Sequence, residues 1–155
     1  MMVKQKWKTY AFWILLSTAV GGLSGLLTRA GVEAFNATAA QPPLSPPKLV
    51  FPIVWGILYV LMGVSAARIS LTASRRGLNL FVAQLIVNFF WSLLFFNAAA
   101  YGFAAIWLLL LWVLVLLMIL AFRQSDTLAA RLQVPYLLWL TFAAYLNIGV
   151  WYLNR

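Results

Sequence analysis

Residues 103–122 read FAAIWLLLLWVLVLLMILAF and hold no charged side chain. An α-helix rises about 1.5 Å per residue, so this stretch is long enough to cross a hydrocarbon layer about 30 Å thick. Apolar stretches of similar length occupy residues 7–27, 49–67, 78–96 and 134–153. We therefore predict an all-α integral membrane protein, a single domain built as a five-transmembrane-helix bundle. A signal peptide is the alternative for the first stretch, because lysines precede it.

The composition excludes a soluble globular domain. Of the 155 residues, 65% are hydrophobic and 8% are charged, whereas soluble domains are about half apolar and about a quarter charged. The chain has no Cys and no His, which excludes disulfides, thiol nucleophiles and Ser-His-Asp triads. The only two acids, Glu33 and Asp126, fall in different connections. We therefore expect no catalytic residue of the usual kinds, no metal site and no required cofactor.

The net charge is +9, from eleven Lys and Arg against two acids. These charges lie between the apolar stretches, so they indicate membrane topology and contact with the lipid bilayer, and not binding to nucleic acid. The positive-inside rule places the more basic side in the cytoplasm, which predicts a cell (inner) membrane protein with its N-terminus inside and its C-terminus outside. The predicted cytoplasmic cations are Lys4, Lys6, Lys8, Arg68, Arg75, Arg76, Arg123 and Arg131, and the outer ones are Arg29, Lys48 and Arg155.

The connection over residues 28–47 is much longer than the others. It ends in the segment QPPLSPP at residues 41–47. Proline fixes the backbone in extended conformations and disfavours helix. We therefore predict that this connection is a semi-rigid, extended lid over the outer mouth of the bundle.

Three neutral amides lie inside the apolar stretches: Gln84, Asn88 and Asn147. Two interpretations remain open for them. They can form hydrogen bonds between helices, as amides in membrane helices commonly do. Alternatively, at least Asn88 is a polar anchor in a ligand cavity.

Aromatic residues share helix faces with these amides. Trp55 is followed four residues later by Tyr59, and Trp91 and Phe95 continue the face of Gln84 and Asn88. Trp139 and Ala143 likewise precede Asn147 on one face. Aromatic walls with a few neutral anchors suit a large, planar, apolar ligand. Tight packing of the same faces, without a cavity, is equally compatible with this periodicity.

Several of these residues belong to longer motifs in the second to fifth stretches. The motifs are Pro46-Pro47, FPIVWGILY at 51–59, Met62-Gly63, Gln84 with Asn88, and ARLQVPYLLW at 130–139 continuing through Phe142, Leu146-Asn147 and Trp151. In order and spacing they resemble the TspO/MBR family, the tryptophan-rich sensory proteins related to the mitochondrial translocator protein.

The resemblance implies a five-helix membrane bundle, often a homodimer. It implies a protein that binds porphyrins, haem and, in some members, sterols or synthetic drugs beneath its first loop. Trp55 and Trp139 match the two tryptophans linked to porphyrin chemistry in the family. The positions that match pocket-lining residues are Asn88, Trp91, Ala143 and Leu146.

The first loop departs from the family pattern. Phe35 and Asn36 stand where the family has Trp-Tyr, Ala39 replaces Leu, Gln41 replaces Lys and Leu44 replaces the last Trp. Because smaller or non-aromatic side chains replace these stacking partners, we expect a weaker porphyrin preference and slower photochemistry. The C-terminal segment 150–155 fits the sterol-contact pattern only loosely, and such patterns are weak indicators.

The leading hypothesis is a membrane protein that binds a porphyrin, a haem or another planar, tetrapyrrole-like or sterol-like molecule, for transport or stress sensing. Arg29 and Lys48 flank the lid, and we predict that they form a ligand rim that pairs with carboxylates. The alternative for these two cations is contact with lipid headgroups. The alternative functions are light-dependent porphyrin degradation, with a radical at Trp55 or Trp139, and a structural or regulatory membrane partner without a small ligand.

Overall fold

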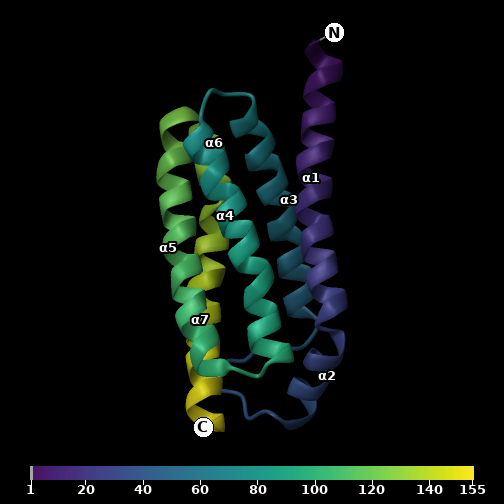
Figure 1. The fold of residues 1–155 in the computed structure, drawn as a ribbon, viewed down its shortest axis with the longest axis vertical. Helices are drawn as coiled ribbons and strands as arrows, with labels where there is room; N and C mark the ends of the chain where they lie inside the picture. The colour runs from purple at the N-terminus through teal and green to yellow at the C-terminus, as the bar shows by residue number, and fades with distance from the viewer. Residues whose placement is uncertain (1) are drawn as a thin grey trace.

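The computed structural model describes residues 2–155, with side chains from Gln5 onward, and its regular elements are all helical. Five helices are long and apolar enough to cross a membrane, and they stand side by side as a bundle (Figure 1). This confirms the predicted five-helix fold. The five are α1 (Met2–Leu27), α3 (Val50–Ser70), α4 (Arg75–Ser92) extended by the π-helical turn η1 (Leu93–Asn97), α5 (Tyr101–Ser125) and α7 (Val134–Asn154).

Local signals in the sequence account for several helix ends. The Ser74 hydroxyl accepts a hydrogen bond from the Gly77 amide at 3.1 Å and caps α4. The Asp126 carboxylate accepts from the amides of Leu128 and Ala129 and caps a short helix, α6 (Thr127–Leu132), which precedes the last span. Pro135 stands in the first turn of α7, where the missing N–H costs no intrahelical hydrogen bond.

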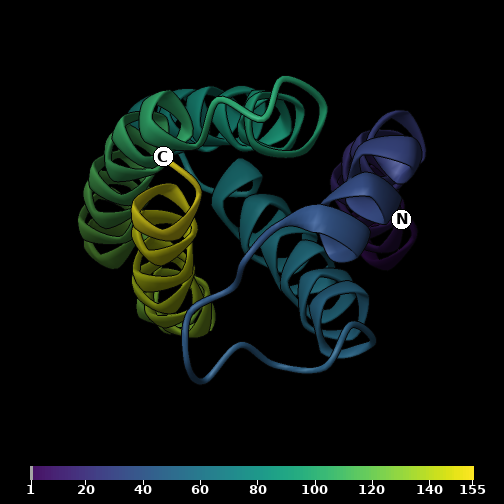
Figure 2. The ribbon, with the colours of Figure 1, turned by 90° about the horizontal axis from the view of Figure 1, so that it is seen from below.

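The connection between the first two spans differs from the prediction. Residues Arg29–Thr38 form a helix, α2, and the backbone becomes extended only at Ala39. The prediction of an extended segment over 28–47 is therefore wrong for its first half. The physical reason is that the four prolines are confined to residues 42–47, so they restrict only the second half. Figure 2 shows α2 and the following segment crossing one end of the bundle.

The two ends of the bundle carry different charges. The N- and C-termini lie at opposite ends of the molecule, with the C-terminus at the α2 end (Figure 1). The predicted split of the cations between the two sides follows this arrangement, although the Lys4 side chain lies outside the described side chains. Which end faces the cytoplasm remains a prediction.

At the end away from α2, two charges form an ion pair. Arg68 Nε lies 2.8 Å from Asp126 Oδ2, and its Nη2 donates to Oδ1 at 3.2 Å. Next to this pair, the side-chain Nε2 of Gln133 donates to Ser65 Oγ at 2.8 Å and to the Leu61 carbonyl. These contacts fasten α6 and the start of α7 to α3.

Candidate functional site

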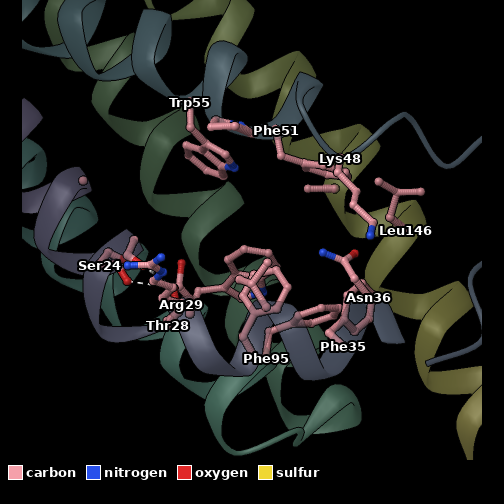
Figure 3. A pocket seen from close by; sticks show the side chains of 18 of the residues that line it. Ser24, Thr28, Arg29, Phe35, Asn36, Lys48, Phe51, Trp55, Phe95 and Leu146 are labelled. Carbon is pink, nitrogen blue, oxygen red and sulfur yellow. Dashed lines mark hydrogen bonds between the residues drawn. The ribbon is translucent and has the colours of Figure 1, made fainter. Parts of the chain in front are cut away.

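A cavity of about 710 Å³ lies at the α2 end of the bundle. It is enclosed by α1, α2, α3, α7, the end of α4 with η1, and the segment after α2 (Figure 3). Sites for small ligands commonly occupy about 300–1,000 Å³. The cavity is therefore large enough for a ligand of several fused or linked rings.

Aromatic side chains form two of its walls. On one side, the Trp55 ring stacks on Tyr59 at 5.7 Å and meets Trp139 at 6.4 Å with perpendicular planes. On the other side, Trp91 stacks on Phe95 at 5.3 Å. All five line the cavity, so the predicted aromatic faces of α3, α4 and α7 do converge.

The α1 wall is built from small residues. Gly22 and Gly25 both line the cavity, and a Cβ atom built on either would meet no atom within 4 Å. Ser17, Gly21 and Gly25 follow one another at intervals of four residues on one face of α1. Ser17 is buried, and Gly21 lies directly against the Tyr59 ring, but Gly25 faces open space. The face thus packs closely at Ser17 and Gly21 and borders the cavity at Gly25.

Helix α2 covers the cavity and is fixed to the end of α4. The Phe35 ring packs against Phe95 at 5.2 Å and Phe96 at 5.5 Å. Gly31 lies so close to the Phe96 carbonyl that a Cβ atom there would be 2.7 Å away, and Asn97 donates to the Leu27 carbonyl at 3.0 Å. Phe35 thus lines the cavity and anchors its cover at the same time.

The segment after α2 is strapped to α7. Asn154 accepts from the Ala40 amide at 3.0 Å and donates to the Ala40 carbonyl at 2.8 Å. The Tyr145 hydroxyl donates to the Pro43 carbonyl at 2.7 Å. The proline-rich segment is thereby held over the cavity at two points.

The mouth of the cavity is polar and basic. Arg29 and Lys48 both line it, as predicted, and Figure 3 shows them on opposite sides. Arg29 Nε lies 4.0 Å from Glu33 Oε1, and both side chains are more than 70% exposed, at 79% and 75%. Asn36 and Gln41 also line the cavity. The mouth therefore has an excess of positive charge.

Two of the three predicted amide anchors form a buried network away from the cavity surface. The Tyr59 hydroxyl donates to Asn88 Oδ1 at 2.9 Å, and Asn88 Nδ2 donates to the Tyr136 hydroxyl at 2.6 Å. Tyr136 in turn donates to Gln84 Oε1 at 2.8 Å. Gln84 and Asn88 are almost fully buried and do not line the cavity.

The third amide is also engaged between helices. Asn147 Oδ1 accepts from the Trp91 indole at 3.0 Å, and Asn147 Nδ2 donates to the Tyr101 carbonyl at 2.8 Å. All three amides therefore form hydrogen bonds between helices. None of the three amides lines the cavity, and a contact between any of them and a ligand stays a prediction.

The remaining predicted residues do come together. Trp55, Tyr59, Trp91, Phe95, Trp139, Ala143, Leu146, Arg29 and Lys48 all line the cavity. Sequence reasoning missed Tyr136, although it lies only three residues before Trp139, because a tyrosine next to a proline at a helix start gives no signal of burial. It also missed the α1 wall, which has no aromatic pattern, and it expected a lid over residues 28–47 without the helix α2 that lines the cavity.

The chemistry of the cavity follows from its lining. It offers flat apolar faces for stacking and an exposed cationic rim. Among the described residues, no three His, Cys, Asp or Glu side chains come together. The Trp139 indole N–H is buried and has no hydrogen-bond partner, so this wall of the cavity carries one unused donor.

Comparisons with known proteins agree on one family. A sequence model of the TspO/MBR family matches residues 13–153. The chain is 35% identical over 151 residues to the tryptophan-rich protein TspO of Chlorobaculum tepidum, covering 94% of this chain and 96% of the relative. It is 34% identical to protein CrtK of Rhodobacter capsulatus, covering 90% and 89%. It is 32% identical to the translocator protein of Bos taurus, covering 96% and 92%.

Proposed function

Since this chain belongs to the TspO/MBR family and is an integral membrane protein, we propose that it binds a tetrapyrrole or a similarly planar apolar ligand in the cavity beneath α2. The observation that carries this proposal is the cavity itself, about 710 Å³ with aromatic walls. Stacking on aromatic faces favours flat ligands over branched ones. The biological use is transport or stress sensing.

The shape of the cavity supports a ligand held on one flat face. The Trp55 and Trp139 side offers the stacking surface, and the Gly22 and Gly25 side leaves space opposite to it. A macrocycle can therefore lie against the α3 and α7 wall with its other face toward α1.

The basic mouth supports a ligand that carries carboxylates. Arg29 and Lys48 can pair with two acidic groups at the open side while the apolar part lies deeper. Because Arg29 is 79% exposed, such a pair adds about 1 kcal/mol or less. The apolar contacts therefore supply most of the affinity, and the cations orient the ligand.

The names of the relatives support the proposed biological use, and the charge distribution supports the proposed orientation in the membrane. Similar proteins are named translocator protein and tryptophan-rich sensory protein, which supports transport or sensing. The greater positive charge at the end away from α2 supports a cytoplasmic N-terminus. The cavity then opens toward the outer side of the cell membrane.

A titration with a dicarboxylic porphyrin in the dark tests the proposal. Porphyrin fluorescence anisotropy should rise with protein concentration and saturate. Trp139→Leu and Phe95→Leu should weaken binding by about tenfold, the loss expected for about 1.4 kcal/mol of stacking energy. Trp7→Leu is the matched control, because Trp7 is 59% exposed on α1 and does not line the cavity. No saturable binding with any planar ligand would favour a purely structural role.

One observation favours a second function for the same site. Trp55, Tyr59 and Trp139 form a contact cluster of oxidisable rings at the cavity wall. Under light, an excited porphyrin stacked there could take an electron from Trp55 or Trp139. Illumination of the bound porphyrin distinguishes the two functions. Loss of porphyrin absorbance that Trp55→Phe abolishes without loss of binding would establish the enzyme.

A further inference from the structure

A second, smaller hollow lies on the outside of the bundle between α3 and α7. Its volume is about 420 Å³. It is lined by Val54, Ile57, Leu58, Leu61, Pro135, Leu138, Trp139 and Phe142. These side chains are apolar apart from the indole N–H of Trp139. We call this hollow the α3–α7 groove.

The groove lies along the two membrane-spanning helices α3 and α7. Its α3 residues begin at Val54 and end at Leu61, roughly 6 to 16 Å along a helix that starts at Val50. Ile57 and Leu138 are 57% and 65% exposed on the outer surface of spans one membrane thick. In a bilayer, this surface faces acyl chains and not water. Molecules that dissolve in hydrocarbon therefore reach the groove directly.

Trp139 separates the groove from the cavity. It is the residue that lines both. On the cavity side its ring meets Trp55 at 6.4 Å and Phe51 at 5.8 Å, and on the groove side it meets Phe142 at 5.7 Å. Displacing this one indole would join the two hollows.

The Trp139 ring is not held by a hydrogen bond. Its buried N–H has no partner. By contrast, the Trp91 indole donates to Asn147 at 3.0 Å and the Trp107 indole donates to the Val87 carbonyl at 2.7 Å. A change of the Trp139 rotamer breaks no hydrogen bond. The same change at a tryptophan whose buried N–H is hydrogen-bonded would cost the free energy of leaving both partners unpaired.

The helices on either side of Trp139 are fastened elsewhere. Helix α3 packs mainly against α1 and α6, and α7 packs mainly against α5. Side chains, and not close backbone contact, thus fill the seam between α3 and α7. The strap that crosses the cavity beside α2, on the other hand, is held to α7 by the hydrogen bonds of Asn154 and Tyr145. Turning the Trp139 indole aside breaks no hydrogen bond, whereas displacing the strap breaks three.

We propose that the α3–α7 groove is a lateral entrance from the bilayer to the cavity, with the Trp139 indole as its gate, and that its occupant is an apolar planar molecule dissolved in the acyl-chain region. The inference rests on the proposed binding function and adds the route and the source of the ligand. The ligand enters from hydrocarbon, the indole turns aside, and the ring then closes behind it as part of the stacking wall.

Exchange kinetics between vesicles test the route. Ile57→Phe with Leu138→Phe fills the groove without touching the cavity lining. Entry of a porphyrin from donor vesicles and its release should both slow by about tenfold, a barrier higher by about 1.4 kcal/mol. The dissociation constant should stay unchanged, because equilibrium does not depend on the route. Ile106→Phe with Leu109→Phe is the matched control on the exposed face of α5 and should leave both rates unchanged.

A cross-link tests the competing route through the mouth. The chain has no Cys, so Ala40→Cys with Asn154→Cys introduces a single pair where the strap meets α7. The oxidised pair should leave entry from vesicles unchanged. If oxidation stops entry while the groove-filling pair has no effect, the lateral entrance is refuted, although binding and the proposed function would stand.

A measurement without ligand makes the inference independent of the binding result. The fluorescence of Trp139 is obtained as the difference between the wild type and Trp139→Phe. In bilayers whose lipids carry bromine near the acyl-chain ends, this fluorescence should be strongly quenched. Ile57→Phe with Leu138→Phe should remove most of that quenching. Equal quenching of Trp139 with and without the groove-filling pair, or no quenching in either, would show that Trp139 has no access to the hydrocarbon through the groove. Either result would overturn the inference.

Discussion

At the scale of single residues, the Tyr136 hydroxyl holds three spans together. It accepts from Asn88 on α4, donates to Gln84 one turn away, and is linked through Asn88 to Tyr59 on α3. The amides on α4 were visible in the sequence as neutral polar residues in apolar stretches. Their partners were not, because tyrosine is enriched at membrane interfaces and its presence in a membrane helix does not indicate burial. Sequence reasoning therefore identified the network's amides but left open whether they bind neighbouring helices or a ligand.

Removing this hydroxyl separates stability from binding. Tyr136→Phe leaves a buried donor on Asn88 and a buried acceptor on Gln84 without their partner, which should cost about 1–3 kcal/mol of unfolding free energy. The porphyrin dissociation constant should change by less than about twofold, since Tyr136 does not line the cavity. Thermal unfolding and titration in the same detergent check both results. Lost affinity at unchanged stability would contradict this reading.

The Arg68–Asp126 pair predicts a pH dependence. Burial opposes ionisation of Asp126, but hydrogen bonds from Arg68 and from the Ala129 and Leu128 amides outweigh it and lower its pKa below the ordinary value. A carboxyl whose pKa is lowered by folding stabilises the protein at pH values above its pKa in the unfolded chain. This stabilisation is lost as the pH falls through the pKa of the folded state. The melting temperature should therefore decrease when the pH is lowered below about 4. In Asp126→Asn the free energy of unfolding at neutral pH should be lower by about 1 kcal/mol, and the melting temperature should fall less on acidification.

At the scale of elements, the apolar stretches predicted the five spans to within a few residues. They did so because span length is fixed by bilayer thickness and not by tertiary detail. The lid was harder to predict. Its prolines identified the extended second half, but α2 depends on Gly31 and Phe35 docking against Phe96, a contact between segments far apart in the sequence. No local pattern reveals such a contact.

The strap predicts a local effect at the lid. Asn154→Ala removes both hydrogen bonds to Ala40, so amides of the segment after α2 should exchange with deuterium faster, by about fivefold for each kcal/mol lost. Amides in α3 and α5 should be unaffected. Hydrogen exchange followed by mass spectrometry compares this variant with Leu153→Ala, which changes an exposed neighbour. Equal exchange in both variants would show that Asn154 does not hold the strap.

At the scale of the whole molecule, charge asymmetry predicts the orientation. Five spans place the two termini on opposite sides, and the excess of cations at the N-terminal end predicts a cytoplasmic N-terminus. In whole cells, a membrane-impermeant thiol reagent should label Arg155→Cys and not Gln5→Cys. Permeabilised cells, in which both positions should react, are the control. Labelling of the N-terminal position alone would invert the orientation and place the cavity on the cytoplasmic side.

The central claim is that the space beneath α2 holds the ligand, and a graded filling series tests it most directly. Gly25 offers open space toward the cavity, so Ala, Val and Leu there should each fit without disturbing the backbone. The dark affinity for a dicarboxylic porphyrin should fall stepwise from Ala to Leu, by about tenfold or more at Leu. Ala19→Leu, on the exposed side of the same helix, should bind as the wild type does. Equal affinity across the Gly25 series would place the ligand elsewhere and contradict the account.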